Sequence, residues 1–183
     1  MPTDGPDNHR RSIRLREYDY AQPGGYFVTI CTHDHKCLFG EVVDSEMHLN
    51  ELGEIVATEW LQTAEIRSEI ALDAFVVMPN HVHAVVFITK DLPSPSKDVL
   101  PRARRGTGPR SLSALVAGFK AATTRRANSI QRKPIDPLWQ RNYYEHVIRN
   151  DQDLDRIRRY VTDNPARWTD DGYHPSKIRA LIE

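Results

Sequence analysis

Residues 74–88 have the sequence AFVVMPNHVHAVVFI, in which two apolar runs flank the dipeptide Pro79-Asn80. Proline followed by asparagine is typical of a turn, and the flanking runs are rich in the β-branched and aromatic residues that strands favour. The stretch therefore predicts two neighbouring strands, at about 70–78 and 82–89, joined at this turn.

The turn is followed by His81-Val82-His83, the first candidate site in the chain. Alternate residues of a strand project to one face, so we expect both imidazoles to lie together while Val82 faces the core. Two neutral imidazoles on a rigid sheet supply half of the ligands of a metal site. The other interpretation is a pair of surface histidines without a function.

Outward from this hairpin, predicted strands and helices alternate along the chain. Further strands are predicted at 26–32, 37–43, 46–49 and 143–148. Helices are predicted after the capping residues Asn50, Ser111 and Asn150. The helix after Asn50 extends to about residue 64, and the helix after Asn150 covers 151–163. Helices between mostly antiparallel strands predict an α+β fold of ferredoxin-like type, an antiparallel sheet with helices packed on it.

The C-terminal helix carries Tyr160, and Asn164 lies four residues further on, so both are expected on one helix face. Leu154, Ile157 and Val161 form the apolar stripe of this helix, with Tyr160 at its edge. Two interpretations stay open. Tyr160 is either a half-buried structural residue, or a phenol beside an amide oxygen that could serve as a third metal ligand.

The chain has 183 residues with 25 basic and 25 acidic side chains, so its formal net charge is zero. This length predicts one domain, which we place at 23–168, with a flexible basic arm at 1–22, a flexible basic loop at 90–110 and a C-terminal tail at 169–183. No apolar run approaches the roughly 20 residues that span a bilayer. Two cysteines make no disulfide framework, so we expect a cytoplasmic protein with no membrane partner.

The neutral total hides a basic segment, because residues 97–133 contain ten basic side chains and one acidic side chain. Such a block is typical of proteins that bind nucleic-acid phosphates, although a solvated loop and helix face would have the same composition. The candidate DNA-binding residues are seven from this segment and one from the arm: Arg102, Arg104, Arg105, Arg110, Lys120, Arg125, Arg126 and Arg14.

A second possible metal site is formed by alternating residues, Cys31, His33, His35 and Cys37. Cysteine and histidine are zinc ligands, but four same-face residues of one strand extend over about 20 Å and converge only if the chain turns. The segment 33–36 is turn-like. A zinc site and ordinary strand residues near a turn therefore both stay open.

The motif MPNHVH at 78–83 resembles the His-hydrophobe-His signature of single-tyrosine transposases. Five further segments are similar to the branch of this family that is associated with repetitive extragenic palindromes (REP): RSIRL at 11–15, YFVTICT at 26–32, LFGE at 38–41, WQRNYYEHVIRN at 139–150 and YVTDNPARW at 160–168. These segments follow one another in order from about Arg11 to Trp168, which makes the resemblance specific.

The resemblance implies the ferredoxin-like fold and a metal-dependent, single-stranded DNA endonuclease and strand transferase that acts beside a DNA hairpin. By position, His81 and His83 would bind Mg²⁺ or Mn²⁺, and Tyr160 would be the nucleophile that forms a 5′-phosphotyrosine intermediate. Asn164 matches the polar residue four after the tyrosine, often glutamine in this family, and would be a third ligand. Relatives include monomers and homodimers, so the oligomeric state stays open.

Two other functions stay open, a relative that nicks hairpins for the host cell and a catalytically inactive protein that binds DNA by sequence or hairpin shape. Tyr143 and Tyr144 are rival nucleophiles, ranked below Tyr160 because neither has a polar partner at helical spacing. Trp139 and these tyrosines could stack on bases, and Trp139 is equally compatible with the core. His146 could lie near the site, but its strand spacing defines no role.

Overall fold

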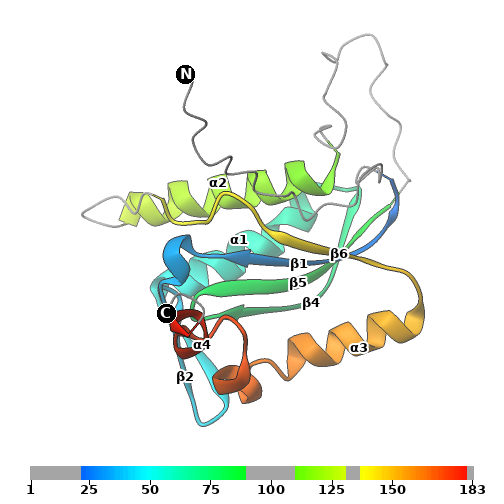
Figure 1. Cartoon of the computed structure of the whole chain (residues 1–183). Helices are drawn as coiled ribbons and strands as arrows, with labels where there is room; N and C mark the ends of the chain where they lie inside the picture. The colour runs from blue at the N-terminus through cyan, green and yellow to red at the C-terminus, as the bar shows by residue number, and fades with distance from the viewer. Residues whose placement is uncertain (1–21, 90–109, 131–136, 181–183) are drawn as a thin grey trace, which may run out of the picture.

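The computed structural model describes residues 22–89, 110–130 and 137–180 (Figure 1). Almost all of the predicted arm and basic loop, with Arg14, Arg102, Arg104 and Arg105, lies outside the described residues. Among the helices that the structure describes, none is both long and apolar enough to cross a membrane.

Four strands form the main sheet: β1 (Gly24–Cys31), β4 (Ile70–Met78), β5 (His81–Ile88) and β6 (Tyr144–Ile148). Their order across the sheet is β4-β5-β1-β6, and each neighbouring pair is antiparallel. Helix α1 (Glu51–Ile66) connects to β4, and α2 (Leu112–Ile130) lies between β5 and β6. This connectivity and strand order are ferredoxin-like, as the sequence predicts.

The segment between β1 and α1 holds a 3₁₀ turn, η1 (His33–His35), and a hairpin of β2 (Gly40–Val43) and β3 (Glu46–Leu49). The hairpin turns at Asp44 and Ser45, which both have positive φ, as the right-handed twist of a two-residue hairpin turn requires. Asn50 then caps α1, because its Oδ1 accepts a hydrogen bond of 3.0 Å from the Gly53 N–H.

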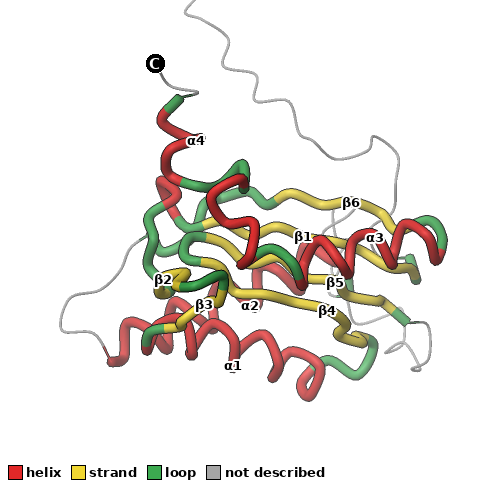
Figure 2. The backbone as a smooth tube through the Cα atoms, turned by 90° about the horizontal axis from the view of Figure 1, so that it is seen from below, coloured by secondary structure: helices red, strands yellow, loops and turns green. Residues whose placement is uncertain are grey.

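Helices cover both faces of the main sheet (Figures 1 and 2). One face packs against α1 and α2 through a large apolar core that includes Val28, Val82 and Trp60. The other face packs against α3 (Asp151–Thr162), where Phe27 and Val85 meet two apolar residues of the helix. Neighbouring residues of β1 and β5 thus face opposite helical layers, as strand alternation requires.

A bidentate ion pair ties α3 to the sheet. Arg158 donates from Nε and Nη2 to the two carboxylate oxygens of Asp73, at 2.8 and 2.6 Å. Asp73 lies where the β4–β5 register shifts, between Leu72 and Phe75. Since Arg158 is two residues before Tyr160, this pair helps to fix where the tyrosine lies.

After α3 the chain continues through η2 (Pro165–Asp170) and α4 (Pro175–Arg179). The predicted domain boundary after residue 168 falls inside η2. The next residue after η2, Asp171, is buried and is held by a hydrogen bond from Asn164. The described residues 169–180 belong to the folded unit because they supply partners for its buried polar groups.

Candidate active site

His81 and His83 lie side by side at the end of β5 that follows the turn. Both side chains are buried, their ring centroids are 4.3 Å apart, and Val82 between them faces the α1–α2 core. The alternation that the sequence predicts is therefore confirmed. The interpretation as surface histidines is wrong, because both rings lie beneath the segment that follows α3.

Each imidazole is oriented through its Nδ1 atom. Thr29 Oγ1 on β1 lies 2.8 Å from His83 Nδ1, and Asn80 Oδ1 in the turn lies 2.8 Å from His81 Nδ1. Burial, with the charge of His83, holds the pKa of His81 well below its usual value, and burial lowers the pKa of His83. Neutral imidazoles with anchored Nδ1 atoms leave Nε2 available to a ligand.

Asp171 completes a buried cluster with the two histidines. Its Oδ2 lies 4.0 Å from the Nε2 atom of each histidine, and the three ligand atoms lie within 4.8 Å of one another. Burial acts to raise the pKa of Asp171, but contacts with His83, the Tyr173 N–H and the Asn164 amide outweigh it and lower that pKa. The cluster therefore holds one negative charge beside two neutral rings.

Asn164 reaches this cluster from the residues just after α3. Helix α3 ends at Thr162, and Asn164 directly precedes η2 with its backbone still in the helical region, at φ −59° and ψ −42°. Its Nδ2 donates to Asp171 Oδ2 at 2.7 Å, while its Oδ1 is buried. The Asn164 side chain also interacts with Tyr160 and acts to lower the pKa of its phenol, so the two residues lie close together as their spacing of four suggests.

Tyr160 brings the phenol to the cluster from α3. Its Oη lies 3.1 Å from His83 Nε2, across 77 residues of sequence. Burial, followed by the negative charge of Asp171, raises the pKa of Tyr160 to about 12. The ring packs edge-on against Phe27, with centroids 6.0 Å apart, so the phenol has a defined orientation.

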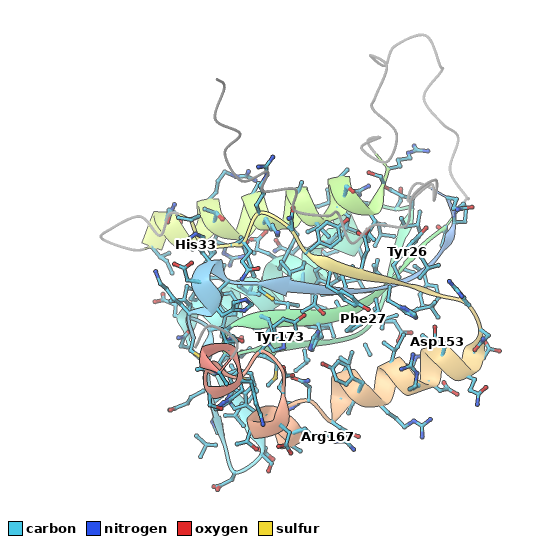
Figure 3. All side chains as sticks on the ribbon, viewed as in Figure 1. Tyr26, Phe27, His33, Asp153, Arg167 and Tyr173 are labelled. Atoms are coloured by element: carbon cyan, nitrogen blue, oxygen red, sulfur yellow. The ribbon has the colours of Figure 1, made fainter. Side chains whose placement is uncertain are left out.

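The phenol also faces a cavity of about 680 Å³ between β1, β6 and α3. Tyr160 remains 42% exposed, so the group lies at the border between the buried cluster and solvent. Tyr144 and His146 on β6 line the same cavity, together with side chains of α3 and η2. Figure 3 shows Phe27 on the sheet facing Asp153 on α3 and Arg167 on η2 across this region.

The described part of the predicted basic surface does not lie at this cavity. It belongs to α2, which covers the opposite face of the sheet from α3 (Figure 1). Arg125 is exposed there, and Arg126 forms an ion pair of 3.0 Å with Glu59. Arg110 lies just before α2.

Lys120, one of the candidate DNA-binding residues, makes its contacts within the fold. Its Nζ donates to the backbone oxygens of Gln140 and Asn142, at 2.8 and 3.0 Å, and burial lowers its pKa to about 8. Lys120 therefore fastens the segment before β6 to α2. Trp139 in this segment is a core residue, since only 6% of it is exposed and its Nε1 donates to Thr123 Oγ1 at 2.8 Å.

The alternating cysteines and histidines do not form a zinc site. In the described ranges, His81, His83 and Asp171 are the one group of such residues whose ligand atoms converge. Residues Asp34 and His35 have positive φ, so η1 turns the chain, but His35 Nε2 lies 2.7 Å from Gln140 Nε2 and Cys37 is exposed. Burial raises the pKa of Cys31 to about 12, which disfavours the thiolate that zinc requires.

Asp171 is the member of the His81-His83-Asp171 cluster that the sequence did not predict. It lies outside any periodic helix or strand pattern, in the segment assigned to the tail. A weak signal was present, because the carboxylate follows closely after the YVTDNPARW segment that carries the resemblance.

The chain thus combines a ferredoxin-like sheet with a buried His-His-Asp cluster and a tyrosine on an adjacent helix. The chain is similar to a solved structure of a REP-associated tyrosine transposase bound to a REP hairpin, with a TM-score of 0.57 and 19% identity over 85% of this chain and 73% of that one. The transposase fold that the resemblance implied is thus confirmed.

An uncharacterized protein of Haemophilus influenzae is 37% identical to this chain over 170 residues, which cover 90% of this chain and 92% of that protein. The chain belongs to the same family as that protein. No family model matches the chain.

Proposed function

We propose that this protein cuts and rejoins single-stranded DNA through a covalent bond to Tyr160, as a tyrosine transposase of the REP-associated kind. The observation that carries the proposal is the distance of 3.1 Å between Tyr160 Oη and His83 Nε2. It supports the proposal because the phenol lies against a buried cluster of two neutral imidazoles and a carboxylate. Perturbed ionisable groups that converge beside a cavity are typical of active sites.

The cluster offers a divalent cation a suitable set of donors. Buried polar atoms are normally hydrogen-bonded, yet His81 Nε2 and Asn164 Oδ1 have no hydrogen-bond partner among the described residues. With His83 Nε2 and Asp171 Oδ2 they make a set of nitrogen and oxygen donors, and we assign these four atoms as ligands of Mg²⁺ or Mn²⁺. When bound, the ion would neutralise charge on the phosphate and orient it for in-line attack.

Tyr160 supplies the nucleophile in this proposal. Its phenolic oxygen forms a bond to phosphorus while the bond from phosphorus to the 3′-oxygen breaks. The phenolic proton leaves to solvent, and the 3′-oxygen takes up a proton. The products are a 5′-phosphotyrosine and a free 3′-hydroxyl, and attack by a 3′-hydroxyl reverses the step without ATP. Because burial raises the pKa of Tyr160 to about 12, the phenol needs positive charge nearby to ionise near neutral pH.

The proposed substrate is single-stranded DNA next to a hairpin. The solved transposase of similar fold is a complex with a REP hairpin, and we extend this substrate class to the present chain. Arg110, Arg125 and Arg126 remain proposed phosphate contacts on the α2 side. The oligomeric state of the active protein stays a prediction, with monomer and homodimer both open.

A covalent-adduct assay tests the proposal. The protein is incubated with labelled single-stranded hairpin oligonucleotides and Mn²⁺ or Mg²⁺, and an SDS-resistant protein–DNA band is sought. Tyr160→Phe should abolish the band and retain DNA binding, while Tyr143→Phe, a change on the opposite face of the sheet beside Ser113, should retain both. His81→Ala or EDTA should also abolish the band. If no divalent ion gives a band although the DNA binds, the inactive DNA-binding alternative is correct.

A further inference from the structure

The cavity beside Tyr160 is one end of a longer groove between β6 and α3. A second cavity of about 590 Å³ adjoins the first, and both are lined by His146, Arg156 and Arg159. β6 forms one wall of the groove, and because it is an edge strand of the four-stranded sheet, no other strand of that sheet lies beyond it. The groove therefore leads from the phenol along α3 toward the start of that helix.

Basic side chains predominate along this groove. Arg149, Arg156, Arg159 and Arg167 line its two cavities, against the carboxylates of Asp153 and Asp163. Guanidinium groups bind phosphate oxygens through several parallel N–H donors, so a row of them suits a chain of phosphodiesters.

Arg156 and Arg159 are oriented by hydrogen bonds that use only some of their N–H donors. Asp153 Oδ1 accepts from Arg156 Nη2 at 2.6 Å, and Asp153 Oδ2 lies 2.8 Å from His146 Nε2 on the opposite wall. Arg159 donates from Nε to the Asp155 carbonyl at 3.2 Å, which leaves both terminal nitrogens for another acceptor. Pre-oriented guanidinium groups lose less side-chain entropy when they bind a phosphate.

Tyr144 supplies an aromatic surface in the same groove. It is 40% exposed, and Phe27 supports it edge-on with centroids 6.3 Å apart. Unpaired bases stack on such rings, whereas bases in a duplex have both faces covered by their neighbours. The combination of a stacking ring and guanidinium groups therefore favours a single strand over a duplex.

We propose that the β6–α3 groove binds the single strand that flanks the scissile phosphate, with Arg156 and Arg159 on its phosphates and Tyr144 against a base. This inference rests on the proposed function, and it places the flanking strand on the opposite side of the sheet from the basic surface of α2. Arg156, Arg159 and Tyr144 are binding residues in this account, and Tyr160 remains the nucleophile.

The test measures binding of a fluorescent hairpin oligonucleotide with a single-stranded flank, in EDTA, at several salt concentrations. Arg156→Gln and Arg159→Gln should each weaken binding about 10-fold. The double variant should reduce the slope of log K against log salt by about 1.4, which corresponds to two single-strand phosphate contacts. Arg141→Gln, an exposed arginine outside the groove, is the matched control and should change neither quantity.

A second arm begins with the wild-type protein, so that its first measurement does not depend on the folding of a variant. Methylphosphonates replace single phosphates on each side of the cut site, and one or two neighbouring positions should weaken binding as the arginine changes do. In the double variant the same replacements should have no further effect. This arm also identifies which side of the cut occupies the groove.

Three results would overturn the inference. The first is that the double variant binds the oligonucleotide with the affinity and salt slope of the wild type. The others are that Arg141→Gln loses as much affinity as the groove variants, or that the groove variants lose as much affinity for a fully paired duplex without a flank. The Tyr160→Phe variant separates this inference from the proposed function. If Tyr160→Phe still forms the adduct, the proposed function fails. If the adduct forms on Tyr160 while the double variant binds normally, only the groove assignment fails.

Discussion

Replacing Tyr160 with phenylalanine should strengthen the binding of a divalent ion. Tyr160 Oη lies 3.1 Å from His83 Nε2, which is the atom that we assign to the ion. His83 Nδ1 faces Thr29 Oγ1 at 2.8 Å, so a proton on Nδ1 leaves one lone pair, on Nε2. The phenol and the ion then compete for this lone pair.

The size of the effect follows from the hydrogen bond that the ion must displace. Such a bond contributes about 0.5–1.5 kcal/mol net, and each 1.36 kcal/mol corresponds to a factor of ten in affinity. Mn²⁺ should therefore bind Tyr160→Phe about 2- to 13-fold more tightly than the wild type. The phenylalanine ring keeps the edge-on contact with Phe27, so the helix position should not change.

The assay is calorimetric titration of Mn²⁺ into each protein without DNA at one pH. Tyr144→Phe is the control, because this tyrosine lines the same cavity and should leave the affinity unchanged. An unchanged affinity in Tyr160→Phe would refute the competition. A weaker affinity would mean that the phenol itself helps to hold the ion.

Three further outcomes follow from the same contacts. Asp171→Asn should weaken Mn²⁺ binding about 10- to 100-fold in the same titration. The control is Asp170→Asn, a change at its exposed neighbour, which should leave the affinity unchanged. If Asp171→Asn binds Mn²⁺ as tightly as the wild type, Asp171 is not a ligand. Asp73→Asn should lower Tm by no more than a few degrees, because its partner Arg158 is partly exposed, yet it should slow adduct formation at saturating DNA by loosening α3. The hydrogen bond from Arg158 lowers the pKa of Asp73, so the stabilisation is present above the ordinary value of 3.8 and is lost as pH falls below it. The Tm difference between wild type and Asp73→Asn should therefore shrink in acid, and a difference that grew there would contradict this assignment. Cys37→Ser should leave Tm within experimental error, since the thiol is exposed and free; a drop of many degrees, restored by zinc, would revive the zinc site.

Local chemistry explains why most of the fold could be predicted. The Pro79-Asn80 turn separates two strand-forming runs, and Asn50 and Asn150 cap their helices through Oδ1 as their positions in the sequence suggest. The alternation at 81–83 predicts the paired imidazoles because a strand has a fixed period of two. These features depend on neighbours in sequence, so the sequence contains the information directly.

The errors concern residues whose surroundings come from distant parts of the chain. Lys120 lies next to the apolar stripe of α2, and helical periodicity does not reveal that the carbonyls of residues 140–142 lie over its ammonium group. Asp171 belongs to no periodic element, and its place beside the histidines depends on Asn164 and the Tyr173 N–H. Such positions are set by tertiary hydrogen bonds rather than by local pattern.

The most direct test of the central claim is mass spectrometry of the protein–DNA adduct. After nuclease and protease digestion, the account predicts one nucleotide-bearing peptide, linked by a phosphodiester to Tyr160, that forms with Mn²⁺ or Mg²⁺ and is absent in EDTA. An adduct on Tyr143, Tyr144 or Tyr173, or one that forms on Tyr160 equally well in EDTA, would contradict it.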